Sequence, residues 1–200
     1  MKKLSLLLAT NNEHKKREFL QIFKEFHIEN IELLMINELL PNKIEIEESG
    51  KTFKENAFLK ASGLFAITKI PTIADDSGLE IDELCGLPGV DSAIFAGEPR
   101  SDARNREKVI SLLKQSDKKN FDARFKTIIC SFSGENTEYF EGKCEGRIIL
   151  EERGSKGFGY DSIFIPNGFE KTFAEMPAAE KNGISHRANA IREFVKSGNF

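Results

Sequence analysis

The first part of the chain alternates between two kinds of hydrophobic spacing. Residues 4–9 form a run that is apolar except for Ser5, which is typical of a strand buried on both faces. After the polar residues 10–12, apolar side chains recur at the spacing of one helix face, at Phe19, Leu20, Ile22, Phe23 and Phe26. The pattern therefore predicts a strand, a polar turn and a helix that begins near residue 13.

Further segments repeat these two patterns along the chain. Strands are predicted at residues 31–36, 71–74, 79–81, 123–132, 137–144, 146–150 and 162–166, and residues 172–176 are expected to be extended. Helices are predicted from a capping box at Thr52 and Glu55 to about residue 66, from a cap at Ser101 or Asp102 to residue 113, from Pro177 over a short segment, and from Ser185 towards the last residues. This mixture predicts an α/β fold.

One acidic segment stands out. Residues 71–74 predict a short buried strand, and Asp75 and Asp76 follow where that strand is expected to end, before a tight turn at Ser77 and Gly78. Adjacent carboxylates repel each other unless a cation lies between or beside them. Mg²⁺ would suit, because it prefers a few carboxylates together with substrate phosphates. The alternative is an exposed turn whose side chains bond their own backbone.

The composition narrows the classes of function. The 200 residues are 40% hydrophobic, which suffices for one domain, and the polar residues 115–121 are the predicted hinge between two lobes. The net charge of −3 argues against nucleic acid as a partner. Three distant cysteines without a C-x-x-C pair indicate a cytoplasmic compartment. The run at residues 4–9 is too short for a signal peptide or a membrane span.

Cations cluster at the starts of two predicted helices. Lys15 lies in the first turn of one, and His186 and Arg187 lie in the first turn of the last helix. Cations there oppose the helix dipole unless an anion shares the site, where it can bind the free backbone N–H groups. We interpret Lys15 as functional, whereas Lys16 and Arg17 fit a solvated basic face. For His186 alone, a structural histidine is the alternative.

Three more features point to a nucleotide. Glycines surround Phe158, which is poorly placed for a core and well placed to stack on a flat ring. Asn56 and Lys60 lie four residues apart and so share a helix face. Glu47 and Glu48 precede that helix, where they could reach a metal or serve as ordinary loop charges. Together these features favour hydrolysis of a nucleoside triphosphate by water.

Six motifs occur in one order over nearly the whole chain. They are LATNNEHK at residues 8–15, ESGKTFKENA at 48–57, ADDSG at 74–78, GLPG at 86–89, GFGYD at 157–161, and AEKN at 179–182 followed by SHR at 185–187. As an ordered set they resemble the HAM1/inosine triphosphate pyrophosphatase family. The family usually has Gly where this chain has Asn11, and Asn tolerates a left-handed backbone better than most residues.

The resemblance implies an elongated mixed β-sheet with flanking helices, arranged as two lobes around a central nucleotide-binding cleft, in a homodimer. It also implies Mg²⁺-dependent hydrolysis of ITP, dITP and XTP to the monophosphate and pyrophosphate, which cleanses the nucleotide pool. By position, Asp76 would be the proton acceptor and a metal ligand, with Glu47 as the second metal carboxylate and Glu48 as the alternative. The implied substrate contacts are Thr10, Asn11, Asn12, Glu13, His14, Lys15, Ser77, Phe158, Gly159, Tyr160, Asp161, Lys181, His186 and Arg187.

Electrostatics add two expectations to these roles. Lys60 would help Lys15 to neutralise the phosphates. Hypoxanthine and xanthine carry an acceptor oxygen at position 6 where adenine carries a donor, so Arg187 and Lys181 would favour the deaminated bases. Two alternatives remain. The SHR motif argues against a Maf-type pyrophosphatase, and a non-catalytic nucleotide sensor would not need Asp75 and Asp76.

Overall fold

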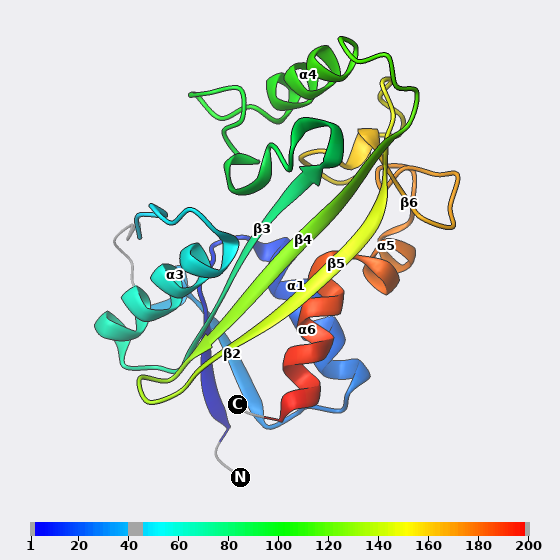
Figure 1. Ribbon diagram of the computed structural model, residues 1–200. Helices are drawn as coiled ribbons and strands as arrows, with labels where there is room; N and C mark the ends of the chain where they lie inside the picture. The colour runs from blue at the N-terminus through cyan, green and yellow to red at the C-terminus, as the bar shows by residue number, and fades with distance from the viewer. Residues whose placement is uncertain (1–2, 40–45, 199–200) are drawn as a thin grey trace. The chain divides into compact units, whose positions relative to one another are not determined.

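The computed structural model describes residues 3–39 and 46–198, except for the side chain of His14 (Figure 1). Its strands are β1 (Leu4–Leu8), β2 (Ile31–Met35), β3 (Thr72–Ile81), β4 (Phe121–Phe132), β5 (Thr137–Ile148) and β6 (Phe164–Pro166). Its helices are α1 (Glu13–Glu25), α2 (Ile36–Leu39), α3 (Phe53–Thr68), α4 (Asp102–Leu113), α5 (Ala178–Ile184) and α6 (His186–Ser197). None of the helices in this described part has the length and apolar character to cross a membrane.

The strands form one mixed sheet in the order β2-β1-β3-β4-β5-β6. Strand β1 pairs in parallel with β2, where Leu8 lies opposite Met35, and in parallel with β3, where Leu8 lies opposite Ile73. Strand β5 pairs antiparallel with β6, where Gly146 lies opposite Pro166. The predicted α/β class with a mixed sheet and flanking helices is confirmed.

The chain divides into two compact units. The first comprises the described residues up to Asp76, residues 127–142 and those from Arg187 onward, and the second comprises residues 77–126 and 143–186. Strands β3, β4 and β5 each contribute residues to both units. The segment predicted as a hinge, residues 115–121, falls inside the second unit, and its hinge role stays a prediction.

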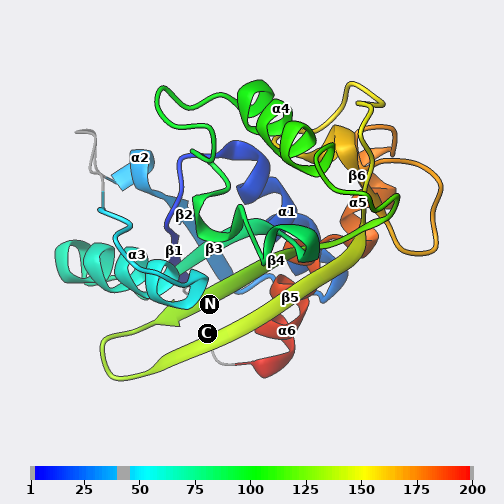
Figure 2. The same ribbon diagram turned by 45° about the horizontal axis from the view of Figure 1, so that its top comes forward.

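In the first unit, alternating side chains of β1 belong to two separate clusters. Leu6 and Leu8 pack in the cluster that contains the buried faces of α1 and α6, whereas Leu7 packs with Leu64 of α3. Successive side chains of a strand point to opposite faces of a sheet. Helices α1 and α6 therefore cover one face and α3 covers the other, as Figures 1 and 2 show.

The second unit has a core that is rich in phenylalanine. Val109 and Leu113 of α4 pack in it with Phe125, Phe164 and Phe173. The rings of Phe125 and Phe164 meet edge to face, with centroids 4.7 Å apart. Pairs with this geometry stabilise a core beyond the area that they bury.

The acidic segment differs from its predicted turn. Strand β3 runs without a break from Thr72 to Ile81, so the predicted strand end at Asp75 and the turn at Ser77 and Gly78 are wrong. Asp, Ser and Gly favour turns when only local preferences act. Here the two carboxylates have cationic partners on both faces of the strand, which are described below, and the ladder continues through them.

The bounds of other predicted elements also differ from those in the structure. Residues 137–144 and 146–150 belong to one strand, β5, up to Ile148, and the predicted strand at 162–166 begins only at Phe164. Residues 172–176 form turns instead of an extended segment. On α1, Phe19, Ile22 and Phe23 are buried as predicted, but Leu20 is exposed, and so is Phe26, which follows the last residue of the helix.

The capping box of α3 is confirmed. The Thr52 hydroxyl accepts the N–H of Glu55 at 3.1 Å, and the Glu55 carboxylate accepts the N–H of Thr52 at 3.0 Å. This box fixes where the helix begins, and it therefore sets which of its residues face β3.

We expect Thr52→Ala to lower the free energy of unfolding by about 1 kcal/mol, because the N–H of Glu55 at the helix start loses its acceptor. Thr52→Ser keeps the hydroxyl and should stay close to the wild type. Urea denaturation followed by circular dichroism measures both. Equal stability of the alanine and serine variants would show that the box contributes nothing.

Candidate active site

Asp75 lies in the middle of β3, and its carboxylate is only 1% exposed. Its Oδ1 accepts a hydrogen bond from Lys15 Nζ at 2.7 Å, and its Oδ2 accepts one from Arg187 Nε at 3.2 Å. Arg187 Nη1 also donates to Glu18 Oε2 at 3.0 Å. Burial raises the pKa of Asp75, but Lys15 and Arg187 outweigh that effect and hold the pKa well below its usual range. Asp75 is therefore ionised and fully compensated.

Asp76 has a different set of partners. Its Oδ2 accepts a hydrogen bond from Asn56 Nδ2 at 3.2 Å, and its Oδ1 accepts one from Lys60 Nζ at 3.3 Å. Lys60 Nζ also donates to Glu48 Oε2 at 2.8 Å. Burial raises the pKa of Asp76 to about 6 against the lowering effect of Lys60, and the charge of Glu48 adds to the rise. This carboxylate is thus poised to take up a proton.

The two aspartates contact helices on opposite faces of β3. The partners of Asp75 come from α1 and α6, whereas those of Asp76 come from α3. Adjacent residues of a strand point to opposite faces, so the carboxylates do not compete for one cation. The prediction that Asn56 and Lys60 share a helix face is confirmed, because both reach Asp76.

The carboxylates near Lys60 fit a hard divalent cation. Within residues 3–39 and 46–198, no three His, Cys, Asp or Glu side chains converge into a ready-made metal site. Asp76 and Glu48 do converge on one cation, the ammonium of Lys60. Mg²⁺ commonly binds one or two carboxylates and takes its other ligands from water and phosphate. Glu47 is exposed and bonds nothing in the described part of the chain, so the geometry favours Glu48 as the second carboxylate.

The turn before α1 is held by its own side chains. Thr10 Oγ1 accepts the N–H of Asn12 at 3.1 Å, and Asn11 Oδ1 accepts the N–H of Asn37 at 3.1 Å. Asn11 is not among the residues with positive φ, so the expected left-handed backbone is not used there. Its amide instead ties the turn to α2. Asn11, Asn12 and Glu13 are exposed at the start of α1, and the side chain of His14 lies outside the described part.

The second unit carries the aromatic part of the predicted site. The Phe158 ring is 45% exposed and lies between Gly157 and Gly159, whose φ angles are 77° and 61°. Asp161 Oδ2 accepts the N–H of Phe158 at 2.9 Å and a hydrogen bond from Lys181 Nζ at 2.6 Å. Lys181 Nζ lies 5.1 Å from the centroid of the Phe158 ring. An aromatic face, a cation and a carboxylate are therefore brought together.

Three other residues that were predicted to contact the substrate lie in the second unit. Tyr160 is buried, and its hydroxyl donates to the carbonyl oxygen of Ser92 at 2.8 Å. His186 is also buried, and its ring stacks on Phe125 with centroids 4.8 Å apart. Ser77 is half-buried on β3. Their contacts with substrate stay predictions.

One residue of these clusters, Glu18, was missed in the sequence analysis. It lies one helical turn after Lys15 on α1 and bonds Arg187. The signal for Glu18 was an acidic residue three positions after a cation on a helix. Arg187, its partner, lies 169 positions away, and no local pattern connects the two.

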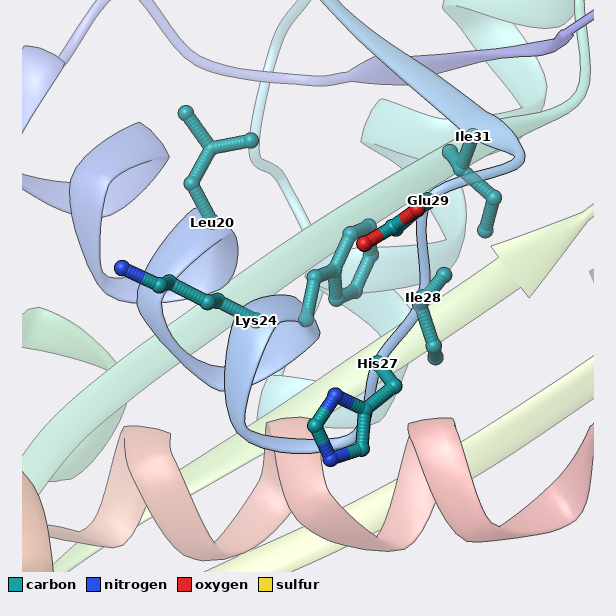
Figure 3. A pocket seen from close by; sticks show the side chains of 7 residues that line it. Leu20, Lys24, His27, Ile28, Glu29 and Ile31 are labelled. Atoms are coloured by element: carbon teal, nitrogen blue, oxygen red, sulfur yellow. The ribbon is translucent and has the colours of Figure 1, made fainter.

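Two hollows lie on the described part of the chain, and the larger one is not lined by any of the predicted site residues. Its volume is about 290 Å³, and it lies where α1 ends and β2 begins, as Figure 3 shows. It is lined by Leu20, Phe23, Lys24, His27, Ile28, Glu29 and Ile31. A smaller hollow of about 140 Å³ is lined in part by Phe158, Gly159 and Asp161. Only the smaller one includes predicted site residues.

The chain belongs to the Ham1 family, whose sequence profile matches residues 6–197. A dITP/XTP pyrophosphatase of Christiangramia forsetii is 45% identical over 193 residues, which cover 96% of this chain and 98% of the relative. The dITP/XTP pyrophosphatase of Bacillus subtilis is 44% identical over 95% of this chain and 94% of its own length. The structure of the Staphylococcus aureus Ham1 protein superposes with a TM-score of 0.85 at 36% identity, over 98% of this chain and all of that protein.

We expect the two aspartates to affect stability differently. Asp75→Asn removes the charge that Lys15 and the buried Arg187 share and should lower the free energy of unfolding by about 3–5 kcal/mol. The pKa of Asp76 is raised by folding, so its charge at pH 7 opposes folding, and Asp76→Asn should leave the free energy unchanged or higher.

Urea denaturation at pH 7 without added metal tests this pair. The two variants change the same atoms at adjacent positions, so each serves as the control for the other. Equal losses of stability in both would contradict the assignment of separate partners.

Proposed function

We propose that this chain hydrolyses dITP, ITP and XTP to the nucleoside monophosphate and pyrophosphate. The observation that carries the proposal is Asp76, a partly buried carboxylate with a raised pKa that shares Lys60 with Glu48. The names of relatives that are about 45% identical over nearly the whole chain support dITP and XTP among these substrates.

Residues of the first unit would bind the triphosphate. Helix α1 begins at Glu13, and a helix start attracts phosphate oxygens through the backbone N–H groups of its first turn. Lys15 and Lys60 add two positive charges, although each is already bonded to a carboxylate. Because each lysine is bonded to a carboxylate, its side chain is already oriented before the substrate arrives. This lowers the free-energy cost of binding the triphosphate.

The proposed reaction is attack of water on the α-phosphorus. A bond forms between the water oxygen and phosphorus, the bond from phosphorus to the α–β bridging oxygen breaks, and the water proton passes to Asp76. Asp76 and Glu48 would also hold Mg²⁺, which supplies positive charge for the leaving pyrophosphate and lowers the pKa of water. Asn56 donates to Asp76 and so restricts the direction of its carboxylate.

Residues of the second unit would bind the base. Phe158 offers an exposed face for stacking, and Lys181 offers a donor beside it for the oxygen at position 6. Two nitrogens of Arg187 are bonded to Asp75 and Glu18, so Lys181 is the stronger candidate for reading the base. An adenine amino group would face this cationic donor without an acceptor, which is costly in a desolvated site.

Two further properties complete the proposal. We infer a cytoplasmic enzyme from the substrate class and the three free cysteines. We also infer a homodimer from the family resemblance, and size-exclusion chromatography with light scattering would measure the mass directly.

Product analysis with Mg²⁺ tests the function. We expect pyrophosphate and monophosphate from dITP and XTP and little product from dATP and dGTP, with Asp76→Asn inactive although folded. Release of single phosphate would mean attack at the γ-phosphorus, and tight binding without product would identify a nucleotide sensor. Either result would overturn the proposal.

Phe158→Ala should raise KM for dITP about tenfold while kcat changes little, because stacking binds the ground state and the transition state alike. Steady-state kinetics at saturating Mg²⁺ measure both constants. Phe26→Ala removes another exposed phenylalanine, on the first unit, and is the matched control. A loss confined to kcat would exclude stacking as the role of Phe158.

A further inference from the structure

Two side chains of α4 hold one glycine of the segment that carries Phe158. Asp102 Oδ2 accepts the N–H of Gly159 at 2.8 Å, and Arg106 Nη1 donates to the carbonyl oxygen of Gly159 at 2.8 Å. Asp102 and Arg106 lie four positions apart and therefore share one face of the helix. A carboxylate and a guanidinium thus bind the two backbone polar groups of the residue that follows Phe158.

Further hydrogen bonds hold the segment around this glycine. Arg106 Nε donates to Glu152 Oε2 at 2.8 Å, and the same Glu152 oxygen accepts the hydroxyl of Ser162 at 2.8 Å. Asp161 accepts the N–H of Phe158 itself. The backbone on both sides of the ring is therefore held by charged groups, and such hydrogen bonds are stronger than neutral ones.

The hydrogen bonds from α4 restrict a backbone that Gly159 would otherwise leave flexible. A Cβ at Gly159 would meet nothing within 4 Å, so glycine serves there for its φ of 61°. A glycine in this conformation has many alternatives open to it. The Phe158 ring, 45% exposed, has little core packing to restrict it. Without an external hold, the ring would have to be ordered when a base binds, at a cost in affinity.

We propose that Asp102 and Arg106 are positioning residues that set the backbone of Phe158 for stacking on the base. The proposal rests on the proposed function, since it assigns to α4 the task of ordering the stacking ring in advance. Neither residue touches the reacting atoms in this account. Their removal should therefore weaken nucleotide binding and leave the chemical step unchanged.

The first arm of the test compares two substitutions at one position. Asp102→Ala removes the acceptor for the Gly159 N–H and should raise KM for dITP about five- to tenfold with kcat within about twofold. Asp102→Asn loses the same charge but keeps an acceptor oxygen, and it should restore KM to near the wild-type value. Lys108→Ala removes another α4 side chain that bonds a backbone carbonyl, that of Phe95, and should behave as the wild type.

The second arm is a double-mutant cycle. If Asp102 acts through the ring, adding Asp102→Ala to Phe158→Ala should raise KM by less than about twofold further. A general structural role would give the full increase in both backgrounds. Full additivity, or equal effects of Asp102→Ala and Asp102→Asn, would overturn the proposal.

A third arm needs no substrate. Amide hydrogen exchange at residues 157–160 should be faster in Asp102→Ala than in the wild type, with residues of the core strand β4 unchanged. Unchanged exchange at residues 157–160 would refute the hold on the backbone. A wild-type chain without dITP hydrolysis would refute the proposed function, whereas the exchange result would still decide whether α4 holds Gly159.

Discussion

The buried ion cluster of Asp75 with Lys15 and Arg187 is the interaction on which the candidate site depends. It joins the start of α1, the middle of β3 and the start of α6 within one unit, and Glu18 completes the compensation of Arg187. Such a cluster adds little net stability, because desolvation offsets the attraction, but removal of one member leaves a buried charge. The cluster therefore ties both α1 and α6 to the same residue of β3.

The alternation of side chains along β3 then separates two kinds of carboxylate. Asp75 is surrounded by cations and stays ionised, whereas Asp76, on the opposite face, has a pKa raised to about 6 beside Lys60 and Glu48. One strand thereby supplies an inert structural anion and an adjacent group suited to accept a proton. The difference arises from the helices on each face, and the two residues themselves are chemically identical.

The sequence predicted those parts whose causes are local. Hydrophobic spacing predicted α1, and a capping box predicted the start of α3. The spacing of Asn56 and Lys60 placed both on one helix face, where both reach Asp76. The course of β3 was not predictable, because local preferences favour a turn at its acidic segment. The cations that permit the strand lie 60 and 112 positions from Asp75, at Lys15 and Arg187, and no spacing rule connects them. The choice between Glu47 and Glu48 was open for the same reason.

A crystal structure with Mg²⁺ and a dITP analogue that cannot be cleaved between the α- and β-phosphates would show which aspartate binds the metal. We expect the metal to bind Asp76 and Glu48 on the face of β3 covered by α3, and Asp75 to keep its bonds to Lys15 and Arg187. Coordination of the metal by Asp75, with Lys15 or Arg187 displaced, would contradict the division of roles between the two aspartates.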